Sequence, residues 1–450
     1  MEVRTASADR SIWRDLPEDI FRTHLVLLEE RTNAVPAETQ VFPLPPDVND
    51  GHRRLISIRD EQRLADSFAF LAAVEQGAQS VAAVCLEERT ADDSFALTVR
   101  FAAVDAIHES LRQSLSVIRQ LLADAATATS AASVTTATIA VGNEEHDNYG
   151  ENLFRSLIRL HHRRLLARLR SSKWEKPKYL SRTHKKPLWQ DFTNLIHRVQ
   201  FLYTKKEKES RLAVETSIAS LANLYEQFED TPLESEYETL SELVRASYKL
   251  CTSQHIRTFA CRLGEIGPTP QIRSAVKTLR QVEKIAAYER LARTLVQATR
   301  QYSNHFRHLE FAYLSPYASV STSIGYETWA KTCHVHAEIQ LIVFYDSRSA
   351  NPQNYSLPPR VIGTSKYLCH LCYLFMKIHG HYPPPNTHGR LYDQWTVPDL
   401  REFDDPLIEK YRRTLKKIDE VITLQTTEAP LWRLEPMTSR ENLLDSTEDP

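Results

Sequence analysis

The sequence predicts an α/β protein in which a largely helical N-terminal region precedes a mixed sheet flanked by helices. Glycine is scarce, at 10 of 450 residues, against an average of about 7%. This scarcity disfavours a fold of many short strands joined by tight turns. Helical periodicity also dominates the first 262 residues, whereas stretches rich in Tyr, Ser, Val and Thr begin at Phe311.

Composition excludes several classes of protein. The hydrophobic share of 42% and the charged share of 25% are typical of globular proteins. The net charge of −2 argues against the whole chain acting as a polyelectrolyte. The six cysteines do not suggest a disulfide framework, and we find neither a signal-peptide pattern nor a run of about 18 apolar residues. We therefore expect an intracellular protein, cytoplasmic or nuclear, with reduced thiols and no membrane partner.

Residues 1–263 form the predicted helical region. Apolar side chains three and four residues apart predict helices over 59–86 and 95–122, and again over 152–169 and 212–262. The tract 123–141 consists mainly of Ala, Thr and Ser. Because it has almost no large side chains to pack, it predicts a flexible linker or loop.

A basic segment covers residues 155–211, with 17 Lys or Arg and four acidic residues. Aromatic residues lie between these charges, as in grooves that bind phosphates and unstacked bases. A second interpretation is a solvated helix face whose charges pair with the seven acidic residues of 226–242. We favour the second interpretation, so nucleic acid remains an open but less favoured partner.

A break rich in Gly and Pro at 264–270 predicts a domain boundary, with a second domain over 268–425 and a loosely ordered tail over 426–450. After a long helix over 272–306, this domain is expected to alternate short strands and helices. The expected elements are two strands within 311–329, a helix over 338–344, a strand over 360–365, a helix over 369–379, a strand over 387–395 and a helix over 405–424.

Two short motifs in the second domain predict a metal site. Cys369 and Cys372 are three residues apart, so on a helix they share a face, and a helix N-terminus favours the thiolate form. His336 and Glu338 are about 200° apart on an ideal helix, so they converge only where the chain enters one. One His and two Cys would hold zinc and leave its fourth position open, and Glu338 would move protons beside it.

Other interpretations of these motifs remain open. Cys333 could join His336, Cys369 and Cys372 in a closed Cys₃His structural site, which would leave Glu338 without a role. The protein would then be a non-catalytic, zinc-stabilised interaction protein. The Cys-x-x-Cys pair alone could also be a redox motif. The order and spacing of the two motifs, and the apolar helical stretch that follows each of them, together favour the open, three-ligand site.

The motif residues carry a family resemblance. They resemble the cytidine-deaminase-like superfamily over roughly 272–400, and more narrowly a mainly fungal branch with a large helical region before the deaminase domain. The quoted runs are His336-Ala337-Glu338-Ile339-Gln340-Leu341, Ser365-Lys366 with Cys369 and Cys372, and Thr387-His388-Gly389. Leu368 departs from the Pro that often precedes the first Cys, which weakens assignment to the nucleoside or RNA-editing branches.

The resemblance implies a deaminase-like mixed sheet, a zinc cofactor and hydrolytic removal of an amino group from a cytosine- or adenine-type base. The substrate would be a nucleoside, a nucleotide or single-stranded nucleic acid. A nucleic-acid-binding module with a vestigial deaminase fold is the alternative from another class.

Four further residues are candidates for substrate binding. Thr387, His388 and Arg390 would lie on a strand beside the pocket, with Arg390 holding a phosphate and His388 a base edge. Lys366, three residues before Cys369, is a candidate of the same kind. The alternative is that this strand is a sheet edge facing water.

Overall fold

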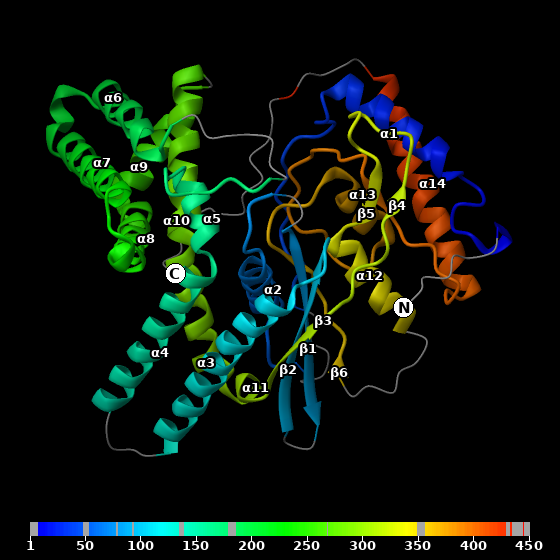
Figure 1. Ribbon diagram of the computed structural model, residues 1–450, viewed down its shortest axis with the longest axis horizontal. Helices are drawn as coiled ribbons and strands as arrows, with labels where there is room; N and C mark the ends of the chain where they lie inside the picture. The colour runs from blue at the N-terminus through cyan, green and yellow to red at the C-terminus, as the bar shows by residue number, and fades with distance from the viewer. Residues whose placement is uncertain are drawn as a thin grey trace. The chain divides into compact units, whose positions relative to one another are not determined.

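The computed structural model describes residues 8–47, 54–77, 80–91, 94–134, 139–178, 186–267, 269–348, 356–428, 433 and 444. The chain divides into two compact units. The sheet unit comprises Met1–Ala73, Ala78–Arg119 and Tyr302–Ser439. The helical unit comprises Val74–Gly77, Gln120–Gln301 and Arg440–Pro450 (Figure 1).

The main sheet is built on a long hairpin in the sheet unit. β1 (Ala82–Ala91) and β2 (Ser94–Ala103) are antiparallel, and β3 (Leu309–Tyr313) runs parallel to β2. β6 (Ser356–Leu357) and β7 (Gly363–Thr364) each pair antiparallel with β1. The predicted strand over 360–365 therefore contains β7.

Helices cover both faces of this hairpin. Ala83 and Cys85 belong to a core shared with α12 (Ala337–Arg348). On the other face, Phe101 packs edge-on against Phe68 of α2 (Ile58–Ala72), with 6.4 Å between ring centroids. Alternate residues of a strand point to opposite faces, so a hairpin covered on both sides buries apolar residues on both, as the run from Ala82 to Leu86 shows.

The predicted helices over 59–86 and 95–122 are wrong where β1 and β2 lie. α2 ends at Ala72, and α3 begins only at Glu109 (Glu109–Val134). The reason is that residues 82–88 are all buried, and periodicity alone does not distinguish a strand buried on both faces from a buried helix.

The predicted linker at 123–141 is also wrong for its described residues. α3 continues to Val134 and α4 (Ile139–Leu160) follows, while residues 135–138 lie outside the described part of the chain. Alanine is the strongest helix former, and Ala125 and Ala126 are small enough to be buried in a packed helix.

A second, three-stranded sheet supports the predicted metal site. β4 (Val320–Ser321) is antiparallel to β5 (Thr332–Val335), and β5 is parallel to β8 (Trp395–Thr396). The predicted strand over 387–395 is thus wrong except at its end. Thr387 forms only isolated bridges, to Gln40 and Leu368, because this stretch is a loop that exchanges a few backbone bonds with two different segments.

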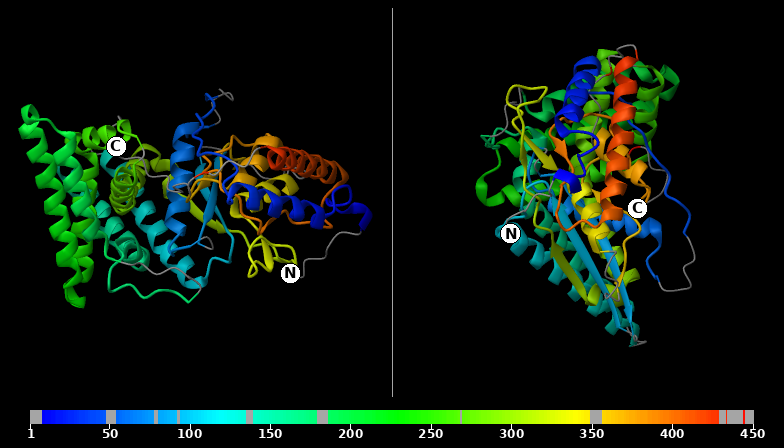
Figure 2. Two further views of the ribbon diagram at one scale, coloured as in Figure 1. Left: turned by 90° about the horizontal axis from the view of Figure 1, so that it is seen from above. Right: turned by 90° about the vertical axis from the view of Figure 1, so that its right-hand side faces the viewer.

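The first helix of the chain belongs to the same unit as the metal motifs. α1 (Glu18–Thr32) lies beside α14 (Asp405–Thr427), as Figures 1 and 2 both show. Phe21 and Leu25 of α1 share a core with α12, α13 (His370–His379) and α14. The sheet unit also contains the short helices η1 (Ala8–Arg10) and α11 (Ser303–Arg307).

The helical unit contains the remaining described helices. They are α5 (His162–Leu169), η2 (Leu188–Asp191), α6 (Phe192–Leu202), η3 (Lys205–Glu207), α7 (Lys208–Glu229), η4 (Leu233–Ser235), α8 (Glu236–Thr252), α9 (Gln254–Glu265) and α10 (Pro270–Gln301). The expected boundary at 264–270 is the turn between α9 and α10, inside this unit. α10 buries apolar residues such as Leu279 and Val282 and packs against α4 and α8, so the helical unit runs on to Gln301.

Many charges of the basic segment are paired within the helical unit. Lys173 lies 3.5 Å from Glu236, which belongs to the acidic stretch, and Arg170 and Lys186 both pair with Asp191. The pair with Glu236 is of the kind that the internally paired interpretation expects, whereas Asp191 belongs to the basic segment itself. Residues 179–185, including Lys185, lie outside the described residues. Most of the predicted tail also lies outside them, as α14 extends to Thr427.

Within the described ranges, no helix combines the length and the apolar character needed to cross a bilayer.

Candidate metal centre

His336 lies between β5 and α12, at the point where the chain enters the helix. β5 ends at Val335 and α12 begins at Ala337, which places Glu338 in the first helical turn. The Gln340 amide donates hydrogen bonds to the carbonyl of Val335 (3.0 Å) and to that of Ala103 (2.8 Å), and thereby ties this entry to β2. The local structure predicted for the His-x-Glu motif is therefore present.

Cys369 and Cys372 lie at the N-terminus of α13. Cys369 is the N-cap residue, and its Sγ accepts a hydrogen bond from the backbone N–H of Cys372 at 3.4 Å. One turn further along, Phe375 packs against the buried Trp395 of β8, with 6.0 Å between ring centroids. The cap and this packing hold both thiols at the start of the helix.

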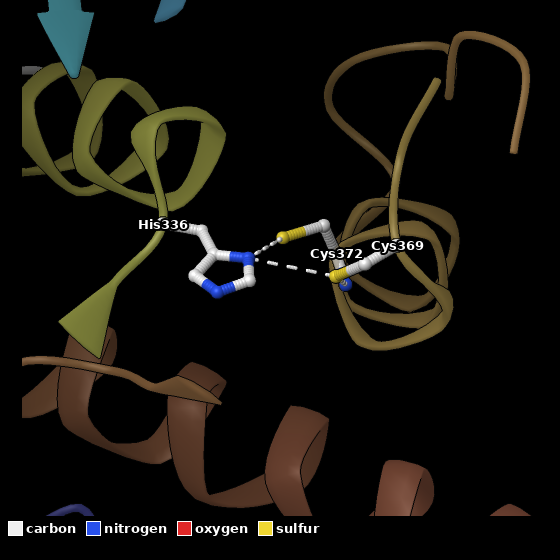
Figure 3. Close-up of side chains that lie close together, drawn as sticks. All are labelled: His336, Cys369 and Cys372. Atoms are coloured by element: carbon white, nitrogen blue, oxygen red, sulfur yellow. Dashed lines mark hydrogen bonds between the residues drawn. The ribbon is translucent and has the colours of Figure 1, made fainter. Parts of the chain in front are cut away.

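The three side chains converge on one point (Figure 3). His336 Nδ1 lies 3.5 Å from Cys369 Sγ and 3.4 Å from Cys372 Sγ, and the three atoms are all within 4.8 Å of one another. Zinc bonds of about 2.3 Å to sulfur and 2.1 Å to nitrogen in a tetrahedron would separate nitrogen from sulfur by roughly 3.6 Å. The spacing and the donor types therefore fit a tetrahedral zinc ion.

The charges of these groups depend on one another. Burial opposes ionisation of Cys369, but hydrogen bonds from Cys372 and the charge of His336 outweigh it, so the pKa of Cys369 falls well below its usual range. Burial and the negative charge of Cys369 raise the pKa of the Cys372 thiol. Burial also disfavours the His336 cation, yet attraction to Cys369 raises its pKa. Two adjacent sulfurs of this kind would both be thiolates beside a metal cation.

Glu338 borders the three donors without belonging to their group. Its Oε2 is 3.6 Å from Cys372 Sγ, which donates a hydrogen bond to it, and only 4% of the residue is exposed. Burial raises the pKa of its carboxyl group. A buried carboxyl group next to the ligands, rather than among them, can accept a proton and return it.

Cys333 lies apart from this group. Its thiol accepts a hydrogen bond from the Arg22 guanidinium, which also pairs with Glu18, and burial raises the pKa of Cys333 to about 11. The closed Cys₃His arrangement is therefore not formed among these residues. His370 is likewise engaged elsewhere, since its Nε2 lies 3.0 Å from the Gln425 side chain.

The loop after α13 carries three of the predicted substrate residues. Thr387 is fully buried, and its hydroxyl donates to the Leu368 carbonyl (2.9 Å) and accepts from the Gly389 N–H (3.1 Å). Its hydroxyl is thus used to shape the loop. The Arg390 guanidinium lies over the Tyr392 ring at 5.6 Å from its centroid.

His388 is electrostatically coupled to the metal-binding group. Its Nδ1 accepts the Arg390 backbone N–H at 3.0 Å, and burial lowers the pKa of its imidazole to about 4. The ring is therefore neutral near pH 7 and carries its proton on Nε2. The charge of Cys369 raises the pKa of this ring and that of Lys366 lowers it. Lys366 is half-buried in the stretch of chain between β7 and α13.

The segment 34–42 is part of this region and was not predicted to be. Its backbone bonds to the loop include Gln40 N–H to Thr387 O (2.9 Å) and the return bond at 3.0 Å. Phe42 also stacks on Tyr373 of α13, with centroids 5.3 Å apart. The segment has no periodic pattern, because it is a short irregular stretch interrupted by Pro36, and its partners lie about 350 residues away in sequence.

Comparison with known proteins supports a deaminase-like domain. Residues 335–399 match the model of a family described as OTT_1508-like deaminase. This range contains the His-x-Glu and Cys-x-x-Cys motifs and the loop with Thr387, His388 and Arg390. Neither the search of curated proteins nor the search of solved structures gave a match. The match does not extend to the helical unit, so the mainly fungal branch stays a prediction.

Proposed function

We propose that this protein is a zinc-dependent hydrolytic deaminase that acts on a nucleobase-type amino group. The proposal rests above all on the convergence of His336 Nδ1, Cys369 Sγ and Cys372 Sγ, with the Glu338 carboxyl group buried beside them. The match of residues 335–399 to a deaminase family supports it. The substrate would be a nucleoside, a nucleotide or single-stranded nucleic acid.

Glu338 is the proton carrier in the proposed reaction. Zinc, when bound, supplies the Lewis acidity that makes water nucleophilic near neutral pH. Glu338 accepts a proton from the attacking water and delivers it to the ring nitrogen of the amidine. It takes the second proton of that water and passes it to the amino group, which leaves as ammonia. The raised pKa of Glu338 suits both the uptake and the return of a proton.

The substrate contacts are proposed on the loop after α13. The Nε2–H of the neutral His388 would donate to a carbonyl oxygen or ring nitrogen on the base edge. Arg390 and Lys366 would hold a phosphate group when the substrate carries one. Thr387 would act indirectly, because its hydroxyl is bonded within the loop.

The test is ammonia release from a panel of nucleosides, nucleotides and single-stranded oligomers. Glu338→Gln should retain zinc and fold but lose turnover by at least about 10²-fold. Glu310→Gln makes the same change at an exposed position of β3 and should leave turnover intact. Loss of zinc from Glu338→Gln would show that Glu338 is a ligand. Absence of ammonia from the whole panel with zinc bound would refute the proposed activity.

A further inference from the structure

The charge of the chain is unevenly distributed, which the net value of −2 conceals. Residues 120–301, nearly all of the helical unit, contain 28 Lys or Arg and 20 Asp or Glu, and therefore carry +8 against −10 for the rest. Many of these cations are paired. Three of the cations, Arg245, Lys249 and Arg293, gather around one hollow between α8 and α10.

This cationic hollow has a volume of about 350 Å³. Its lining residues are Arg245, Tyr248, Lys249 and Thr252 of α8 with Glu289 and Arg293 of α10. Glu289 is the one acidic residue among them. It accepts the Nε–H of Arg293 at 2.8 Å and lies 3.8 Å from Arg245 Nε.

Both guanidinium groups are further oriented by aromatic rings. Arg293 lies over Tyr248 at 5.1 Å from the ring centroid, and Arg245 lies over Phe154 at 4.5 Å. The two guanidinium groups are therefore held in place before any ligand arrives. Arg245 also pairs with Glu151, which lies outside the lining, and the lining itself keeps a formal charge of +2. Fixed guanidinium groups beside a lysine are a favourable environment for phosphate oxygens.

A second hollow adjoins the first across Lys249, which lines both. It has a volume of about 640 Å³ and lies between α7, α8 and the start of α9. Its lining includes the hydroxyl, amide and imidazole groups of Ser217, Ser220, Asn223, Gln227 and His255, and none of its lining residues is acidic. His255 Nε2 lies 2.9 Å from Ser217 Oγ. Such neutral donors and acceptors suit a sugar and a base rather than a cation.

We propose that the two hollows together form a binding site for a nucleoside phosphate on the helical unit. The phosphate lies in the cationic hollow against Arg245, Lys249 and Arg293, and the nucleoside lies in the polar hollow between α7 and α8. Both volumes fall within the range of ligand sites. The ligand is either a free nucleotide or one unit of a single strand. The site does not depend on the metal centre or on deaminase activity.

Binding is measured by calorimetry on the full chain at low salt, with three probes: a mononucleotide, a single-stranded oligonucleotide and inorganic pyrophosphate. Lys249→Glu should lower the binding affinity for all three probes by at least about tenfold, since it turns an attraction into a repulsion close to the phosphate. Lys277→Glu makes the same change at an exposed position of α10 outside both hollows, and its affinity for the probes should stay within about twofold of the wild-type value. Equal losses in the two variants would refute the site in favour of general charge attraction.

A second variant tests the nucleoside part. Ser220→Trp, at an exposed position on α7, fills the polar hollow without removing a charge. This variant should weaken the binding of the mononucleotide and of the oligonucleotide but not that of pyrophosphate. Tight binding of the mononucleotide supports a free nucleotide as ligand, and binding of the oligonucleotide alone supports a strand. Binding of pyrophosphate alone, or of no probe, overturns the proposal. Melting curves establish that each variant is folded.

Discussion

Gly389→Ala should release the N-terminal segment 34–42 from the loop that carries His388. Gly389 has a φ of +72°, and a Cβ there would lie 2.1 Å from the Ala37 carbonyl oxygen and 2.6 Å from its carbon. These are backbone atoms, so no side-chain rotation relieves the overlap. Either the segment or the loop has to move.

The expected cost follows from what that movement breaks. An alanine in the left-handed region costs about 1 kcal/mol relative to glycine. Four backbone hydrogen bonds join the two segments, from the N–H groups of Ala37, Gln40, Thr387 and Leu391, and each contributes about 1 kcal/mol net. Gly389→Ala should therefore lower the free energy of unfolding of the sheet unit by about 3–5 kcal/mol.

Gly380→Ala is the matched control. Gly380 caps α13 with a φ of +75°, but the nearest atom to its added Cβ is 3.9 Å away, so only the conformational cost of about 1 kcal/mol remains. Urea unfolding of both variants measures the difference, and limited proteolysis reports whether residues 34–42 are released. Similar losses for the two glycines, or protection of the segment in Gly389→Ala, would refute this account of the loop.

Two other predictions concern the metal and a buried acid. Cys369→Ala and Cys372→Ala should each lose zinc, since structural zinc binding is worth about 10 kcal/mol or more in small domains, whereas Cys333→Ala should keep its zinc. Metal analysis after dialysis measures the occupancy, and full zinc occupancy in Cys369→Ala and Cys372→Ala would contradict the site. Burial, with the charge of Asp393, raises the pKa of Glu29 from 4.5 to about 8. The contribution of the neutral Glu29 carboxyl group to stability is complete below about pH 4.5 and is lost as pH rises through 8, by up to about 5 kcal/mol. Urea unfolding at pH 5 and pH 9 should show Glu29→Gln losing less stability than the wild type, and parallel losses would refute this.

The elements of the metal centre could be predicted because its geometry is local. Cys369 and Cys372 occupy the N-cap and first turn of α13, where a spacing of three residues brings both thiols to one side. His336 and Glu338 converge because α12 begins between them, at Ala337. The order and spacing of the two motifs, each followed by a helical stretch, predict that they belong to one site.

The loop after the cysteines was predicted less well, because its form depends on distant segments. A strand was expected over 387–395, yet the bonds of Thr387 and Gly389 go to residues 37–40 and to Leu368. Their partners give no periodic signal in the sequence. The tautomer of His388 follows from the backbone N–H of Arg390, which only the folded loop brings to Nδ1.

The α/β class could be predicted from apolar periodicity along the chain. The His-x-Glu and Cys-x-x-Cys motifs and the helices α12 and α13 could be predicted because each depends on residues within a few positions of one another. Tertiary structure alone decided that 82–91 and 94–103 are strands, since a segment buried on both faces has no amphipathic period. It alone separated Cys333 from the other cysteines, because Arg22 and Glu18 of α1 occupy the space around that thiol. These features depend on contacts between segments that are up to some 300 residues apart, and local patterns of apolar and polar residues do not predict such contacts.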